Sequence, residues 1–431
     1  MKKGILIFLT LFTMIIGLGQ TSDLAGTEIY VAIRSLPETD FIMSKVSEFT
    51  QQTGIKVRFV LYPELQLREK VVMDFVSNVG AYDVIALDSV YVEEFVQKGW
   101  LLPLDSYLKE ETNIDDFFQK VLQMFIREGK VYGLPVYSEI THLMYRKDIF
   151  QEKGIKVPQT FEELEKVASQ LNNPPEMYGI AMRGLRGDGM NVYTWTTFLR
   201  GFGGKYFDDS WNPVFNNEEG VKSLEYYTNL LTKYGPPGVA TYSWDDVQSA
   251  FTSGSVSMII DANNFMTRIE DPEKSQIVGK IGYAPVPSGP AGIFPGIYSM
   301  GFGVSAIGAK TEKEKLAAAE FVQWATSSEM QLEMALQTGV VSANRSSVFD
   351  NPVFQAKYSD DIYPGWLSST LLSYDLAMPD FRPLIPEWRE VGNTVGIAIE
   401  QALSGALTPK KALDQAAKEC ERILRASGKI K

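Results

Sequence analysis

The sequence predicts an α/β fold built as two blocks, each with helices packed on a sheet. Residues 28–87 alternate strand and helix as β-α-β-α-β, which is the pattern of a parallel sheet flanked by helices. The same alternation of strand and helix resumes after residue 130. No Ser/Gly-rich linker separates the blocks, so ordered strands must join them. Such a join suits hinge closure around a ligand.

Apolar spacing defines the elements of the first block. They are a strand over 28–33, a helix over 40–53, an alternating strand over 55–59, a helix over 65–78 and a buried strand over 83–87. Gly54 ends the first helix. Ligands of such sheets bind at the carboxyl ends of strands, which here are residues 34–40 and 88–91.

The second block shows the same signals. We expect strands over 178–182, 256–261 and 302–307, and helices over 160–171, 221–231, 243–252, 311–326 and from residue 408 onward. Thr160 and Glu163 have the spacing of a capping box, in which each side chain bonds the backbone of the other. Pro409 stands at a first helical position.

Residues 132–150 contain the chain's one histidine, His142, in an apolar run that Pro135 and several polar residues interrupt. Pro135 lacks the N–H that a central strand needs for its ladder. We therefore interpret the segment as a strand that ends in one block and begins pairing again in the other. Tyr137 and Glu139 then lie on the crossing, and His142 is structural or incidental.

The N-terminus has the layout of a signal peptide. Lys2 and Lys3 precede an apolar run from Ile5 to Leu18, and small and polar residues follow it. The run is short for a membrane span, although a retained anchor is the alternative interpretation. No cysteine lies near the end of the apolar run, which excludes lipid attachment there. We expect residues 1–22 to be removed and the exported protein to be free and soluble.

Charge and residue counts exclude several functions. The formal net charge of −12 argues against nucleic acid and against anionic membrane surfaces. The single cysteine, Cys420, lies in a helical apolar stripe, so no intramolecular disulfide forms. One histidine leaves little room for a Ser-His-Asp site or for zinc, and no G-x-S-x-G or G-x-x-x-x-G-K-[ST] motif is present. We expect no metal and no cofactor.

Aromatic residues make up 12% of the chain, and several lie near predicted strand ends or loops: Tyr91, Tyr137, Trp195, Trp211, Trp244 and Tyr298. Rings stack on the C–H faces of sugars, while acids, amides and arginines bond hydroxyl groups. This mixture in a cleft fits a carbohydrate or a polyol. Packing of helices on sheets is the alternative role for each ring.

Five segments resemble, in order and spacing, the family 1 extracellular solute-binding proteins, which are the sugar-capturing subunits of ABC importers. They are residues 95–105 (FVQKGWLLPLD), 133–135 with 143–148 (GLP and LMYRKD), 157–164 (VPQTFEEL), 250–258 (AFTSGSVSM), and 317–324 with the turn at 339–345. Arg146 stands where that family usually has asparagine. The likeness covers nearly the whole chain after the N-terminal segment.

Within that family the chain is similar to the sorbitol- and mannitol-binding branch. The likeness rests on residues 183–189, 202–208, 234–238, 258–261 and 324–327. The chain departs from that branch at residues 298–300, where tryptophans are common. A cyclitol such as inositol or a small saccharide would therefore fit as well as a linear polyol.

The resemblance implies a periplasmic-binding-protein fold of class II type, with two α/β lobes joined by a strand hinge and a ligand cleft between them. By analogy, residues 24–138 plus 300–345 form lobe one, and 139–299 plus 346–431 form lobe two. It implies a monomeric periplasmic receptor without catalysis that closes over a polyol, cyclitol or small sugar and delivers it to an ABC permease. An oligosaccharide or iron receptor of the same fold and a secreted glycan-active enzyme are the alternatives.

We expect side chains of both lobes to hold the ligand, with carboxylates and arginines bonding its hydroxyls and rings stacking on it. The candidate contacts are Glu38, Asp88 and Tyr91 at strand ends of lobe one, Tyr137 and Glu139 at the hinge, Arg183, Trp195, Trp244, Asp261 and Tyr298 from lobe two, and Arg345 returning from lobe one.

Overall fold

The computed structural model describes residues 24–431, so the predicted signal peptide over 1–22 lies outside the described residues. The strands are β1 (Glu28–Ile33), β2 (Lys56–Leu61), β3 (Val84–Asp88), β4 (Ile126–Arg127), β5 (Lys130–Val131), β6 (Leu134–Arg146), β7 (Met258–Ala262), β8 (Ile281–Pro285) and β9 (Ile297–Val304).

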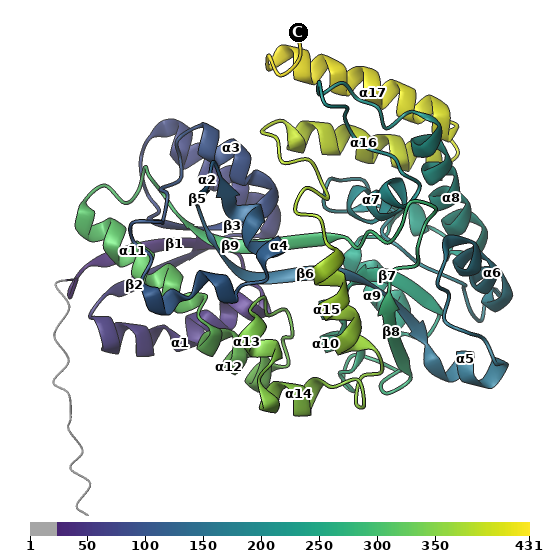
Figure 1. Ribbon diagram of the computed structural model, residues 1–431, viewed down its shortest axis with the longest axis horizontal. Coiled ribbons are helices and arrows are strands. Elements are labelled where there is room, and N and C mark those ends of the chain that lie inside the picture. Colours follow the sequence, from purple (N-terminus) through teal and green to yellow (C-terminus); the bar gives the residue numbers. More distant parts are fainter. Residues whose placement is uncertain (1–23) are drawn as a thin grey trace, which may run out of the picture.

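The α-helices cover the sheet on both faces in each half of the molecule (Figure 1). They are α1 (Pro37–Thr53), α2 (Glu64–Ser77), α3 (Val92–Gln97), α4 (Gln119–Leu122), α5 (Lys147–Lys153), α6 (Phe161–Leu171), α7 (Asn191–Gly201), α8 (Glu218–Tyr234), α9 (Trp244–Thr252), α10 (Met266–Ile269), α11 (Glu312–Ala325), α12 (Ser328–Thr338), α13 (Ser346–Phe349), α14 (Pro352–Tyr358), α15 (Trp366–Leu376), α16 (Trp388–Leu403) and α17 (Pro409–Ala426).

One mixed sheet runs through both halves, in the strand order β2-β1-β3-β9-β6-β7, with β8 also paired to β6. β1 pairs in parallel with β2 and β3, which confirms the parallel arrangement predicted for the first block. β9 is antiparallel to β3 and β6, and β6 is antiparallel to β7 and β8. The strands of the second block, β6, β7 and β8, therefore pair antiparallel, in contrast to the parallel pairs of the first block.

β6 joins the two lobes as one strand of 13 residues. Its residues 134–140 pair with β9, and its residues 141–146 pair with β7 and β8. The break that we expected at Pro135 is a register shift between Pro135 and Tyr137, so the ladder is disturbed there without ending. Figure 1 shows β6 and β9 running between the two halves of the molecule.

Buried apolar side chains form separate cores on the two sides of this crossing. One core combines strands β1, β3 and β9 with helices α1 and α11. A second combines α6, α7, α8, α16 and α17, and a third lies between α9, α10, α13 and α14. Helix α15 contributes Trp366 to the third core and Tyr374 to the first, so the C-terminal part of the chain packs against both lobes at the hinge.

Local signals in the second block were partly right. The Thr160 hydroxyl accepts from the Glu163 N–H at 3.2 Å, but the Glu163 carboxylate accepts from the Gln159 N–H at 2.7 Å in place of the expected Thr160 N–H. The strand expected over 178–182 is reduced to isolated bridges at Tyr178 and Ala181. The Tyr234 carbonyl accepts hydrogen bonds from backbone N–H groups of that segment. Those N–H groups are then not available for a continuous strand ladder.

Candidate ligand-binding site

Polar side chains from lobe one meet the hinge at the carboxyl ends of two parallel strands. Arg34 follows β1 and Asp88 ends β3, and adjacent parallel strands place such residues at one edge of the sheet. Arg34 Nη2 donates to the Tyr298 hydroxyl at 3.0 Å and to the Tyr137 hydroxyl at 3.2 Å, and it lies 3.6 Å from Asp88 Oδ1. The Tyr298 hydroxyl in turn donates to Asp88.

Glu38 lies in the first turn of α1 and is 4% exposed. Its Oε1 accepts from the Ser342 hydroxyl at 2.6 Å, which ties α1 to the segment after α12. Burial raises the pKa of Glu38, and the Ser342 hydrogen bond and the charge of Arg34 oppose that rise.

Lobe two contributes a buried ion pair between Arg183 and Asp261. Arg183 Nε donates to both carboxylate oxygens, at 3.1 and 3.0 Å, and Arg183 Nη1 donates to the Gly189 carbonyl at 2.8 Å. The guanidinium carbon lies 4.8 Å from the centre of the Tyr193 ring. Asp261 is in β7 directly opposite His142 of β6, which fixes the pair beside the hinge.

Glu139 stands between these two groups. It pairs with Tyr298 in the β6–β9 ladder, and its Oε1 accepts from Asn264 Nδ2 at 3.4 Å. Burial raises the pKa of Glu139 to about 7, the charge of Arg183 opposes the rise, and the charge of Asp261 adds to it. A carboxyl group that is protonated over part of the neutral range can both donate to and accept from a hydroxyl ligand.

These contacts join seven of the residues expected from the sequence into one polar network across the hinge, namely Glu38, Asp88, Tyr137, Glu139, Arg183, Asp261 and Tyr298. We call this set, with the residues added below, the hinge network.

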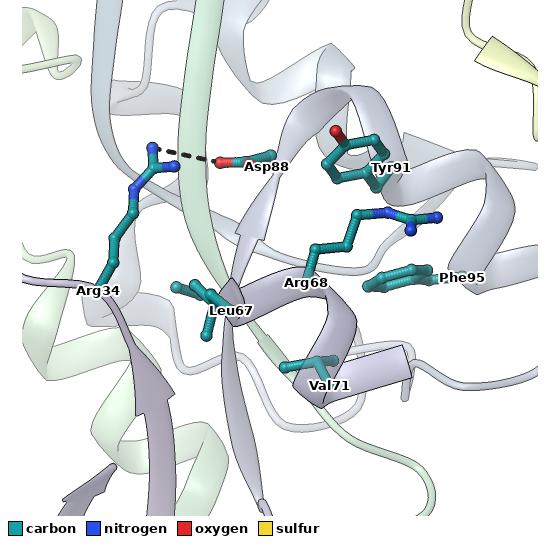
Figure 2. Close-up of a pocket in the computed structure, with 8 residues that line it drawn as sticks. Arg34, Leu67, Arg68, Val71, Asp88, Tyr91 and Phe95 are labelled. Atoms are coloured by element: carbon teal, nitrogen blue, oxygen red, sulfur yellow. Dashed lines mark ion pairs between the residues drawn. The ribbon is translucent and has the colours of Figure 1, made fainter. Parts of the chain in front are cut away.

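Tyr91 adjoins the network through a small pocket in lobe one. The pocket is lined by Arg34, Leu67, Arg68, Val71, Ala86, Asp88, Tyr91 and Phe95, and Figure 2 shows Asp88 between Arg34 and Tyr91. The Arg68 guanidinium carbon lies 4.7 Å from the centre of the Tyr91 ring, which also stacks on Phe95. Burial raises the pKa of Tyr91, and the charge of Asp188 from lobe two adds to that rise, so the lobes approach each other here.

Trp195 is not part of the hinge network. It is fully buried, its Nε1 donates to the Ser223 hydroxyl at 3.1 Å, and its ring meets Tyr206 edge to face. Nearly every residue of α7 is buried, so its aromatic side chains pack into the core of lobe two. The expectation that this ring faces a ligand has no support in its surroundings.

Arg345 is also held elsewhere. Its donors are bonded to the carbonyls of Thr326, Thr112 and Asn113 at 2.7, 3.0 and 3.1 Å, and Nη1 pairs with Asp116 at 3.3 Å. These contacts make it a structural tie within lobe one. Trp244, the first residue of α9, is 36% exposed, and no described contact links it to the network.

Four further residues belong to the network, and sequence reasoning missed them: Arg34, Asp188, Tyr193 and Arg382. Arg34 could have been found from the sequence, because it directly follows the first predicted strand, where ligands of such sheets bind. Asp188 lies within the glycine-rich segment 183–189, and Tyr193 follows that segment. Arg382 lies between α15 and α16, and nothing in the local sequence places it near the hinge.

Residues 24–431 offer neither a metal cluster nor a membrane span. They contain no group of three or more His, Cys, Asp or Glu side chains arranged to hold a metal ion. The same residues include no helix with the length and apolarity to cross a bilayer.

Two lobes joined by antiparallel strands, with buried polar side chains converging at the joint, are the architecture of a solute-binding protein. The chain belongs to the bacterial extracellular solute-binding protein family, whose sequence model matches residues 35–332. It is 27% identical over 417 residues to the mannitol-binding protein of Pseudomonas aeruginosa, an alignment that covers 92% of this chain and 94% of that protein.

Solved structures extend the similarity to the whole fold. A solute-binding protein from Agrobacterium radiobacter, solved in complex with ribitol, has a TM-score of 0.83 and 29% identity, covering 93% of this chain and 99% of its own. A solute-binding protein from Agrobacterium vitis with bound D-mannitol has a TM-score of 0.80 and 28% identity, with the same coverage of 93% and 99%.

Proposed function

We propose that this protein is the periplasmic receptor of an ABC importer that captures a polyol, a cyclitol such as inositol or a small sugar by hinge closure and delivers it to the membrane permease. The hinge network carries the proposal. Its arginines, carboxyl groups and tyrosine hydroxyls form a dense set of donors and acceptors that suits a hydroxyl-rich ligand. The ligands of the ribitol- and mannitol-bound relatives support the same class.

The proposal includes the expected lobe boundaries, 24–138 plus 300–345 and 139–299 plus 346–431, with the hinge in β6 and β9. The receptor acts as a monomer after removal of residues 1–22 and performs no catalysis. The rings of the network favour a small ligand over an oligosaccharide, because Tyr137, Tyr193 and Tyr298 are buried or nearly so among charged groups. A long sugar chain needs exposed aromatic platforms.

A thermal-shift screen tests the function. Purified protein is heated with D-mannitol, ribitol, erythritol, myo-inositol and maltose, one at a time. A ligand that binds only the folded state adds about 2.7 kcal/mol at a hundredfold excess over Kd, so at least one compound should raise Tm clearly. No response to any of them would refute the proposal, and turnover of a labelled oligosaccharide would favour the glycan-active enzyme.

Calorimetry with the responding compound tests the site. Glu139→Ala should weaken binding while the protein stays folded, because the carboxyl group lies at the centre of the network. Trp244→Ala tests the remaining aromatic candidate, which we keep as a predicted contact. Unchanged affinity in both variants would contradict this placement of the site.

A further inference from the structure

Arg382 is a buried cation with unused hydrogen-bond donors. It lies in the segment between α15 and α16 and is 4% exposed. Its Nη1 donates to the Asp188 carbonyl at 3.0 Å, whereas Nε and Nη2 have no hydrogen-bond partner among the described residues. The guanidinium carbon lies 5.3 Å from the Tyr193 ring and 5.7 Å from the Tyr298 ring, so this group faces the hinge network from lobe two.

The other arginines of the network have carboxylate partners. Arg34 pairs with Asp88, and Arg183 pairs with Asp261. No carboxylate oxygen of the described residues lies within ion-pair distance of Arg382. Leaving buried donors of a charged group unsatisfied is costly. Several described arginines have one buried nitrogen atom without a hydrogen-bond partner, whereas Arg382 has two, on one edge of its guanidinium.

We propose that Arg382 binds the ligand directly, with Nε and Nη2 donating to two adjacent hydroxyl oxygens of a neutral polyol. The inference rests on the proposed function and deepens it, because it names a ligand contact and the chemical group that the contact recognises. Nε and Nη2 lie on one edge of the planar guanidinium, and that edge presents two parallel N–H groups. Two oxygens on neighbouring carbon atoms match this spacing.

Two buried oxygen atoms beside members of the hinge network also lack partners among the described residues. They are the Tyr193 hydroxyl, on the ring that lies 5.3 Å from the Arg382 guanidinium carbon, and Asn264 Oδ1, which is farther along the network beside Glu139. A hydroxyl group both donates and accepts, so a polyol that accepts from Arg382 can also donate to these oxygens. The unpartnered atoms of Arg382, Tyr193 and Asn264 thus include both donors and acceptors, and the hydroxyl groups of a polyol can pair with both.

The charges of the network favour a neutral ligand over a sugar acid. Three arginines face five carboxyl groups, namely Arg34, Arg183 and Arg382 against Glu38, Asp88, Glu139, Asp188 and Asp261. The burial and the acidic neighbours that raise the pKa of Glu139 and Asp188 also disfavour the negative charge of a carboxylate ligand.

If Arg382 had a structural role, protein atoms should accept hydrogen bonds from all of its nitrogen donors. Arg345 shows that arrangement, since its Nε, Nη1 and Nη2 all donate to backbone carbonyls. Arg127 is a largely buried arginine away from the hinge. Its side chain pairs with Glu93, and one nitrogen atom, Nη2, has no partner among the described residues. Arg127 therefore serves as a matched control that is outside the proposed site.

Calorimetry of Arg382→Met, Arg382→Lys and Arg127→Met with D-mannitol and ribitol tests the proposal. Arg382→Met should weaken binding about 10- to 100-fold, because a hydrogen bond to a charged group contributes about 1.5–3 kcal/mol and each 1.4 kcal/mol is tenfold. Arg382→Lys should lose about as much, since a single ammonium group cannot form the paired contact. Arg127→Met should bind within about twofold of wild type.

Thermal unfolding without ligand separates a contact from a structural tie. Arg382→Met should lower Tm less than Arg127→Met does. Arg382 has no carboxylate within ion-pair distance among the described residues and acts on the Asp188 carboxyl group only through its charge, whereas Arg127→Met leaves Glu93 without its ion pair. Wild-type affinity in either Arg382 variant overturns the inference while the polyol function stands. A loss of Tm in Arg382→Met as large as the loss in Arg127→Met also overturns the inference. Tighter binding of D-mannonate than of D-mannitol overturns the neutral class, and a wild-type protein that binds no polyol refutes the function itself.

Discussion

Replacing Glu139 with glutamine should flatten the pH dependence of folding stability. Burial raises the pKa of the Glu139 carboxyl group from 4.5 to about 7 in the folded protein. Between those values the folded state holds a proton that the unfolded state has released, so stability is highest below the unfolded pKa and falls as pH rises through the folded pKa. Glutamine keeps the shape of the side chain and does not titrate.

The magnitude follows from the size of the pKa change. Each pKa unit corresponds to about 1.4 kcal/mol, so the full shift would cost about 3.4 kcal/mol above pH 7. Part of the Glu139 surface is accessible to solvent, which reduces the cost. Between about pH 5 and pH 8, wild type should therefore lose about 2 kcal/mol more stability than Glu139→Gln.

Guanidinium unfolding of ligand-free protein at several pH values measures this difference. Other buried acids, such as Glu38 and Asp188, also have a raised pKa, so only the difference between wild type and variant reports Glu139. Glu421→Gln on the outer face of α17 is the control for loss of one carboxylate, and its curve should follow wild type. Parallel curves for wild type and Glu139→Gln would refute the reasoning.

Three further perturbations test the surroundings of the site. Asp261→Asn should cost about 3–5 kcal/mol in chemical unfolding, because it leaves the buried Arg183 without its carboxylate, and an unchanged midpoint would contradict the pair. Trp195→Ala should cost about 3–5 kcal/mol while the folded fraction keeps its ligand affinity, and the opposite pattern would return Trp195 to the binding site. Arg389→Ala removes a half-exposed ion pair of 3.8 Å to Glu69 that links α16 to α2. Ligand affinity measured by calorimetry should change less than about fivefold, and the change should disappear at about 0.5 M salt. A larger loss of affinity, or one that salt does not remove, would contradict a weak contact at the surface.

The sequence located much of the hinge network because strand ends are local features. Asp88 follows an unmistakable buried strand, and Glu38 falls in the turn after the first strand, so the order of residues alone assigns both to one edge of the sheet. Tyr137 and Glu139 stood out because they lie on the expected crossing between the two blocks, in an apolar run that polar residues interrupt. The run proved to be one strand with a register shift.

Burial separated the side chains that the sequence could not distinguish. Trp195 and Arg345 looked like ligand contacts by residue type. Trp195, in α7, packs into the core of lobe two, and Arg345 donates to three carbonyls of its own lobe. The residue type determines which interactions a side chain can make. Packing determines which neighbouring groups accept hydrogen bonds from its donors.

The sequence by itself determined the alternation of strands and helices, the likeness to a solute-binding family and the polar character of the strand ends. Only the tertiary structure decided that β6 and β9 form one antiparallel crossing, and that Arg382 reaches the same hinge as Arg34. The physical reason is distance along the chain. Capping, periodicity and strand ends depend on residues a few positions apart, whereas the hinge network joins side chains from segments hundreds of residues apart, which only the folded path of the chain brings together.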